Sequence, residues 1–497
     1  MKTDPATPLR RFKPYPAYKD SGVEWLGEIP AHWTAKHLRW AIMFQRGHDL
    51  PTDEREDGQV PVVTSSGISS THSRAVAKSP GIVTGRYGTI GHFHPIMEDY
   101  WPLNTTLYSI DLRGNDPRFL LYMLTHLSPL FLLNAVKSAV PGVDRNDIHP
   151  TRTVVPPLDE QRAIATFLDR ETARIDALVA KKERLIALLQ EKRTALITRA
   201  VTKGLGPNVP MKDSGVEWLG EIPAHWEVKR VKFIAQIGNG STPSREKPEY
   251  WGGEYSWLNS SVVNLREVTE PSDFVTDLAL AECHLPRIHP PAVLVGITGE
   301  GKTRGMATLL RIEATINQHL VFIRPTRSDC DAEYIRYALH AAYQFLRDES
   351  GGGGSTKGAL TCGQLGNVSI PFPADSEQSA IAVFLDGETA RIDTLIAKVR
   401  DAIERLKELR TALISAAVTG KIDVGGPSFR RKPESRGRGG WTPAFAGVTE
   451  GARRCLRREW CDNGQDRRAG GGSSFRRKPE SRGPGGGWTP AFAGVTK

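Results

Sequence analysis

The sequence predicts a protein of the mixed α/β (α+β) class, with two repeated domains that are each followed by one long helix. A stretch of 44 residues without proline, 159–202, recurs as a similar stretch at 376–419. The fifteen-residue segment KDSGVEWLGEIPAHW, called the repeated segment below, occurs unchanged at 19–33 and at 212–226. Because a repeat of about 200 residues is far too long for a solenoid unit, it indicates a duplicated domain.

These repeats divide the chain into five segments. We expect a first α/β domain at 1–158, a first long helix at 159–205, a second α/β domain at 206–375, a second long helix at 376–424 and a low-complexity basic tail at 425–497. Within each domain, short β-branched runs alternate with glycine and proline, which is typical of strands joined by turns. The apolar run 117–136 and residues 332–348 are predicted to be helices.

Each long helix carries a narrow apolar stripe that requires a partner helix. On a heptad grid, the first stripe contains Ile164, Leu168, Ile175, Leu178, Leu185, Leu189 and Leu196, interrupted by Glu171, Lys182 and Lys192. The second contains Ile381, Leu385, Ile392, Leu395, Val399, Leu406, Leu409 and Leu413. The alternative is that each helix lies on its own domain, but a seam of some forty residues is too long for one small domain face. We therefore predict an antiparallel coiled coil, with helices of roughly 63 Å at 1.5 Å per residue.

Composition excludes several classes of protein. Five cysteines without CxxC spacing predict reduced thiols rather than a metal site or a disulfide framework. The sequence has neither a signal-type N-terminus nor an apolar run of 18 residues, so we expect a cytoplasmic protein without membrane contact. The net charge of +10 arises in the tail, where 16 basic and 6 acidic residues leave the rest of the chain balanced. Any DNA-binding face must therefore come from local arrangement.

Four further motifs complete the pattern. They are the glycine turn Gly85–Gly88, the triplet Asn317–His319 ahead of a strand, and the helix starts Pro156–Ala165 and Pro371–Ala382, which share Glu-Gln and Ile-Ala. Together with the repeated segment, they make residues 15–424 resemble the DNA-specificity subunit of a type I restriction-modification system. The second helix start departs from the family pattern in detail but keeps Glu377 and Gln378.

The resemblance implies a subunit that binds double-stranded DNA and does not catalyse. Two target-recognition domains would read an asymmetric bipartite site, with the coiled coil as a ruler between them. The long helices would dock modification subunits, two copies being expected, and restriction subunits would join the complex. S-adenosylmethionine, ATP and Mg²⁺ are expected on those partners, and no cofactor or metal is expected in this chain.

Candidate DNA contacts are loop residues with readout chemistry. Arginine suits guanine, amides suit adenine, and other cations neutralise phosphates. In the first domain these are Ser65, Ser66, Arg86, Tyr87 and Arg145; in the second they are Ser241, Thr242, Arg245, Lys302, Arg304 and Lys357. The alternative for each is a solvated loop side chain. Trp251 and Trp257 are predicted to be core residues rather than base-stacking platforms.

Two other functions are considered. Gly296–Thr303 reads GITGEGKT, which matches a P-loop and follows an apolar run, but the following residues do not read as the helix that must hold phosphate. A free-standing coiled-coil interaction protein is the other alternative, although it leaves two different α/β domains unexplained. The pairs His92 and His94, and His284 and His289, lack the supporting ligands of a metal site.

The tail contains a second, unrelated repeat. Residues 428–449 recur in nearly the same form at 474–496, rich in glycine, proline and arginine. This composition predicts disorder. The tail resembles a repetitive intergenic element read through into protein; the alternative is a basic arm that adds nonspecific DNA affinity.

Overall fold

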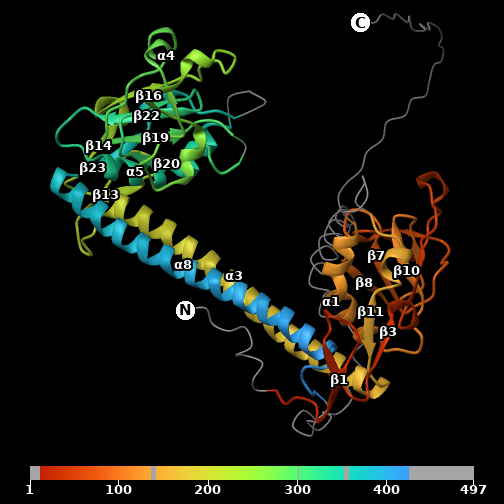
Figure 1. Ribbon diagram of the computed structural model, residues 1–497. Helices are drawn as coiled ribbons and strands as arrows, with labels where there is room; N and C mark the ends of the chain where they lie inside the picture. Colours follow the sequence, from red (N-terminus) through yellow and green to blue (C-terminus); the bar gives the residue numbers. More distant parts are fainter. Residues whose placement is uncertain (1–11, 136–141, 300, 352–357, 425–497) are drawn as a thin grey trace, which may run out of the picture. The chain divides into compact units, whose positions relative to one another are not determined.

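The computed structural model describes residues 12–135, 142–299, 301–351 and 358–424. Two α/β domains alternate with two long helices along the chain (Figure 1). The predicted tail and Lys357 lie outside the described residues.

The first domain is built on an antiparallel sheet and a smaller mixed sheet. The main sheet has the order β4 (Met43–Arg46), β10 (Thr106–Asp111), β7 (Gly81–Gly85) and β8 (Phe93–Ile96). The small sheet has the order β6 (Gly67–His72), β5 (Val60–Thr64) and β9 (Trp101–Pro102), with β5 and β9 parallel. Helix α1 (Pro117–Ala135) packs on β7 and β8, and α2 (Arg145–Ile148) is one short turn. Strand β7 is buried throughout, which places the core between sheet and helix.

The second domain repeats this topology with additions. Its main sheet has the order β15 (Ala235–Asn239), β22 (Leu320–Pro325), β19 (Ala292–Gly296), β20 (Ala307–Leu310) and β17 (Glu267–Val268). Its small sheet has the order β18 (Asp273–Val275), β16 (Trp251–Leu258) and β21 (Thr315–Ile316), with β16 and β21 parallel. The helices are α4 (Asp277–Glu282), α5 (Ala332–Ala341), α6 (Tyr343–Glu349) and α7 (Cys362–Asn367).

Four two-stranded ribbons, two for each domain, join the domains to the helices. They are β1 (Tyr18–Asp20) with β2 (Glu28–Pro30), β3 (Thr34–His37) with β11 (Arg152–Val155), β12 (Met211–Asp213) with β13 (Glu221–Pro223), and β14 (Glu227–Arg230) with β23 (Ser369–Phe372). Short 3₁₀ turns are η2 (Leu38–Trp40), η3 (Thr52–Glu54), η4 (Val231–Phe233), η5 (Pro248–Tyr250) and η6 (Ser260–Asn264). Because β11 and β23 each precede a long helix, these ribbons direct both helices out of their domains.

The two long helices are α3 (Leu158–Lys203) and α8 (Asp375–Val418). Each begins one residue before the repeated stretch seen in the sequence. Gly204 follows α3 and Gly420 follows α8, with φ angles of 73° and 72°. Glycine adopts this left-handed conformation without steric cost, which allows the chain to turn away from the helix end.

The helices pack on each other in antiparallel orientation. The core of the first domain includes Ile164 from the start of α3 and Leu413 from the end of α8. The core of the second domain includes Ile197 from the end of α3 and Ile381 from the start of α8. Each domain is therefore packed on the beginning of its own helix and on the end of the other helix.

The buried seam between the helices differs from the predicted stripe at every second layer. On α3 the side chains that are buried or half-buried at alternating spacings of four and three are Leu168, Thr172, Ile175, Val179, Lys182, Ile186, Leu189, Arg193, Leu196 and Ala200. On α8 they are Leu385, Thr389, Ile392, Ile396, Val399, Ile403, Leu406, Arg410, Leu413 and Ala417. The seam placement predicted for Leu178, Leu185 and Leu395 is wrong, because these side chains are exposed. The neighbouring Val179, Ile186 and Ile396 take their layers.

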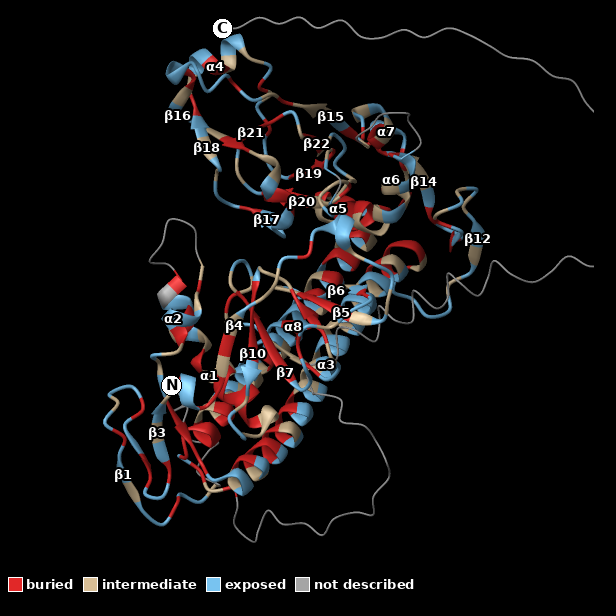
Figure 2. Cartoon of the chain, turned by 90° about the vertical axis from the view of Figure 1, so that its right-hand side faces the viewer, coloured by how far each residue is buried: buried red, intermediate tan, exposed pale blue. Residues whose placement is uncertain are grey.

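The buried residues lie mainly in the sheets and at the contacts between the domains and the long helices. Figure 2 shows buried residues, coloured red, concentrated in the central strands and on the long helices where they contact the domains. Across the described ranges, no helix combines the length and the apolar content that crossing a bilayer requires.

Candidate nucleic-acid interface and the joints of the helix pair

Four loops meet at one edge of the first domain's main sheet. The Thr89 hydroxyl donates a hydrogen bond to the Ser65 carbonyl, which joins the turn after β5 to the loop after β7. The Asn104 amide donates to the Asp49 carboxylate, which joins the loop before β10 to the loop after β4. These contacts bring the predicted glycine turn, Gly85–Gly88, close to the candidate residues Ser65 and Ser66.

Arg86 is held inside this cluster rather than projecting from it. Its guanidinium donates to the Asn104 carbonyl at 3.3 Å and lies 3.8 Å from the Asp144 carboxylate. Its side chain is only 14% exposed and lies over the ring of Tyr87, 5.1 Å from the ring centroid. Arg86 thus stabilises the loops, and a direct DNA contact by this residue stays a prediction. Ser66, Tyr87 and Arg145 are exposed at the same cluster.

The second domain carries the same loop arrangement with different side chains. Thr242 donates from its hydroxyl to the Gln318 amide oxygen at 2.6 Å. Strand register shows that Gln318 corresponds to Asn104, because β22 pairs with β15 and β19 as β10 pairs with β4 and β7. Thr242 in turn corresponds to Asp49, 193 residues earlier. Equivalent loops therefore place an amide side chain at one position in both domains; sequence reasoning missed these residues, although the register of the two strands marks them.

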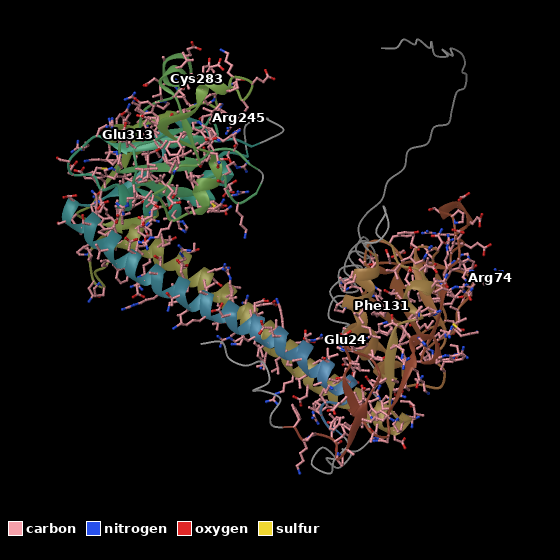
Figure 3. All side chains as sticks on the ribbon, in the orientation of Figure 1. Glu24, Arg74, Phe131, Arg245, Cys283 and Glu313 are labelled. Carbon is pink, nitrogen blue, oxygen red and sulfur yellow. The ribbon has the colours of Figure 1, made fainter. Side chains whose placement is uncertain are left out.

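Arg245 lies on an aromatic platform beside this cluster. Its guanidinium carbon is 3.5 Å from the centroid of the Trp251 ring, and its Nη1 donates to Asp273 at 2.8 Å. Arg245 is labelled in the second domain in Figure 3. The pKa of Asp273 is below its usual value. The main cause is the hydrogen bond from the backbone N–H of Phe274, and the nearby Arg245 guanidinium is a smaller cause. Trp257 is buried and donates its indole N–H to the Ser241 carbonyl at 3.2 Å, so it is a core residue as predicted. The stacking and the ion pair hold the Arg245 guanidinium in place, and a DNA contact by this residue stays a prediction.

The P-loop match is contradicted by its geometry. Strand β19 and strand β20 form a hairpin in which the Gly305 N–H donates to the Gly296 carbonyl at 2.8 Å. A P-loop instead opens a helix whose N-terminus binds phosphate. Lys302 is exposed on this hairpin loop, and its carbonyl accepts a hydrogen bond from the Tyr343 hydroxyl at 2.8 Å. Arg304 is half-buried, with its guanidinium against the backbone of Gly358.

The repeated segment forms the same joint in both halves. The Trp33 indole donates to Glu160 at 2.9 Å, and the ring of His32 lies 2.6 Å from the same carboxylate. In the second half, Trp226 donates to Glu377 at 2.9 Å, and His225 lies 3.0 Å from it. The repeated segment is therefore a structural clamp that fixes the first turn of each long helix.

The clamp also holds the end of the opposite helix. The Lys421 ammonium, just after α8, donates to the Glu28 carbonyl at 2.6 Å. Lys203, at the end of α3, donates in the same way to the Glu221 carbonyl. A Cβ on Gly420 would lie 2.4 Å from Pro30, which explains why glycine ends this helix. Both ends of the helix pair are thus anchored to copies of one fifteen-residue segment.

The glutamines that follow these glutamates hold the domain helices. The Gln161 amide accepts from the Asp116 N–H at 2.9 Å, and the Gln378 amide accepts from the Asp331 N–H at 3.0 Å. Asp116 and Asp331 accept the first N–H groups of α1 and α5. The Glu-Gln pair of each helix start therefore connects the helix to both the clamp and the domain.

Among the predicted docking residues, burial distinguishes two groups. Ile164, Leu168, Ile175, Ile381, Leu385 and Ile392 are buried, and Leu189 and Leu406 are half-buried. Leu178 and its counterpart Leu395 are 41% and 49% exposed, and Leu185 is exposed as well. Only the exposed leucines are available to a partner. Within the described ranges, no group of three or more His, Cys, Asp or Glu side chains is placed to hold a metal ion.

Comparison with known proteins gives a consistent result. The family model described as the type I restriction modification DNA specificity domain matches residues 43–187 and 223–405. The type I restriction enzyme MjaIX specificity subunit of Methanocaldococcus jannaschii is 31% identical over 200 residues, covering 39% of this chain and 44% of that subunit. The chain thus spans less than half the length of that relative.

Two further similarities cover more of the chain. The type I restriction enzyme EcoDI specificity subunit of Escherichia coli is 22% identical over 431 residues, covering 80% of this chain and 90% of that subunit. One chain of a solved structure that concerns complex assembly and conformational transition of the type I R-M system is also similar. Its TM-score is 0.58 at 19% identity, and the match covers 78% of this chain and 98% of that chain. This structural likeness concerns the fold alone.

Proposed function

The chain belongs to the type I restriction-modification DNA specificity family, and we propose that it is the DNA-reading subunit of such a system, with one domain for each half of a bipartite target. One observation carries this proposal. Equivalent loops at equivalent sheet edges present different polar pairs, Asp49 with Asn104 and Thr242 with Gln318. A shared scaffold with different readout groups is suited to two different half-sites.

The helix pair acts as a coiled-coil ruler in this proposal. The seam repeats at spacings of four and three on both helices, which is the pattern of knobs-into-holes packing. Because each domain is anchored at one end of the pair by the clamp, the length of the helices sets the separation of the half-sites.

Modification subunits dock on the exposed face of the helices. Leu178 and Leu395 occupy equivalent positions on α3 and α8, which supports two copies bound in the same way. Restriction subunits would join this complex. Base chemistry with S-adenosylmethionine, and ATP hydrolysis with Mg²⁺, then belong to those partners, and this chain supplies recognition without catalysis.

The test is the methylation motif that the chain directs. Cells would express it with its cognate modification subunit, and adenine methylation across the genome would be read by single-molecule sequencing. We expect one new motif with two different half-sites around a fixed gap, absent from cells that lack this chain. A soluble complex that produces no motif would refute DNA reading and favour a protein-interaction role.

A further inference from the structure

An exposed aromatic side chain follows the clamp at the same place in both halves. Trp40 in η2 is 56% exposed, and Phe233 in η4, 193 residues later, is 67% exposed. In each 3₁₀ turn the residue two positions earlier, Leu38 or Val231, is fully buried. The turn therefore directs one apolar side chain inward and holds one large ring in solvent.

Each of these rings has at least one cationic side chain close to it. The Arg39 guanidinium lies 5.4 Å from the centroid of the Trp40 ring, and that of Arg113 lies 6.0 Å from it. The Lys232 ammonium lies 5.3 Å from the Phe233 ring. A basic residue followed by an aromatic one thus recurs at equivalent positions. Farther along, the halves diverge, with Met43-Phe44-Gln45 in one and Gln236-Ile237-Gly238 in the other.

The location of the rings indicates what they contact. Turn η2 follows β3, whose partner β11 leads directly into α3, and turn η4 follows β14, whose partner β23 leads into α8. The rings are thus attached to the helix starts, and they are not on the loops that differ between the domains. A group that reads different sequences would differ between the halves, whereas a group that binds the same partner twice would be repeated.

We propose that Trp40 with Arg39 and Arg113, and Phe233 with Lys232, are two equivalent docking points for the modification subunit, one for each copy. This inference rests on the proposed function and deepens it. The partner surface that fits is an apolar pocket rimmed by carboxylates, because an exposed ring flanked by cations gains most from burial against such a surface. Docking then extends from the helices onto the base of each domain.

The experiment measures stoichiometry in the full complex by native mass spectrometry, titrating the cognate modification subunit. The wild-type chain is expected to bind two copies. Trp40→Ala and Phe233→Ala should each weaken one site about tenfold or more, leaving a complex with one copy, and the double variant should lose both. Arg39→Glu and Lys232→Glu form a second matched pair, which tests the charge without removing a ring.

Controls separate this inference from folding and from DNA binding. Met97→Ala and Leu278→Ala remove other exposed apolar side chains, one in each domain, and should keep two copies bound. Thermal unfolding of all variants should match the wild type, since the rings are exposed. Variants that bind two copies with unchanged affinity would overturn the inference, and so would variants that lose only DNA affinity. A wild-type complex with two copies but no methylation motif would instead refute the proposed function.

Discussion

Asp176 of α3 accepts a hydrogen bond from Arg410 of α8 at 3.1 Å, across the interface between the long helices. The counterparts of these residues, each 217 positions away in the repeat, form the second ion pair, Asp393 with Arg193 at 3.3 Å. The two pairs are therefore exchanged by a pseudo-twofold axis, which crosses α3 beside Leu185 and α8 beside Ala402. A duplicated domain has thus produced a helix pair that is symmetric in its charges as well as in its seam.

These ion pairs should specify the register of the helices more than their stability. Asp176→Arg places a second guanidinium opposite Arg410 and should cost about 1 kcal/mol, because both groups are partly solvated. Adding Arg410→Asp restores opposite charges and should recover most of that loss. A double-mutant cycle, measured by denaturant unfolding, gives the coupling free energy. No recovery in the double variant would show that the pair does not form.

The clamp predicts a larger and local effect. Glu160→Ala leaves the buried indole N–H of Trp33 without an acceptor, and we expect it to cost about 1–3 kcal/mol. Glu377→Ala should cost less, because Glu160 also accepts from the Tyr15 hydroxyl at 3.2 Å. Glu160→Gln keeps an acceptor and serves as the control. The measurement is the midpoint temperature of thermal unfolding for each variant. If both alanine variants unfold at the wild-type midpoint, then the hydrogen bonds of the clamp do not stabilise the protein.

Much of this architecture could be predicted from the sequence, because the chain contains an internal repeat. The duplicated segment and the proline-free stretches predict the two domains and the two long helices, while the second predicted helix, 376–424, extends beyond the end of α8 at Val418. The carboxylates that accept the hydrogen bonds of the clamp, Glu160 and Glu377, were not predicted. The recurrence of His-Trp in the repeated segment and Glu-Gln at both helix starts is a signal that could have identified Glu160 and Glu377.

The seam was harder to predict. Predicted and observed seams share Leu168, Ile175 and Leu189 but differ by one residue in the layers between them. Leucine is the most apolar choice at 178 and 185, yet packing places Val179 and Ile186 inside. Where two neighbouring positions of a heptad are both apolar, the pattern does not show which of them faces the partner helix. Packing against that helix determines which side chain is buried. Loop contacts such as Thr242 with Gln318 depend on long-range sheet register and leave no local pattern.

Acid should destabilise the second domain through His340. The pKa of His340 in α5 is lowered to about 4. Burial is the main cause, and the positive charges of Arg193 and Arg336 nearby add to it. In the unfolded chain this pKa is about 6.5, so the unfolded state binds more protons between these values and stability falls as the pH decreases through that window. Between pH 7.5 and pH 5, His340→Gln should lose less stability than the wild type, by about 2 kcal/mol or less.

The matched control for this pH dependence is His284→Gln, which replaces an exposed histidine of the same domain. Its unfolding free energy should follow that of the wild type at both pH values. If His340→Gln shows the same pH dependence as the wild type, then the imidazole is not held neutral in α5 and the proposed cause of acid sensitivity is wrong.

Gln318 and Asn104 should each control one half of the recognised sequence. Both amides lie at equivalent positions ahead of β22 and β10, and an amide side chain can read adenine through two hydrogen bonds. Gln318→Ala should relax one position of one half-site, by about 1–3 kcal/mol of discrimination, and leave the other half-site unchanged. Asn104→Ala should do the reverse. The methylation motif of each variant, read across a genome, gives the result.

Orientation of the amide provides the sharper form of this test. Thr242 holds Gln318 through its hydroxyl, so Thr242→Val, which removes the hydroxyl and keeps the shape, should relax the same half-site position as Gln318→Ala but to a smaller extent. Gln236→Ala is the control, since this exposed glutamine lies in β15 and pairs with Arg324 at 2.8 Å. Its motif should equal that of the wild type. Relaxation of both half-sites by Gln318→Ala would show that the residue supports the complex rather than reading a base.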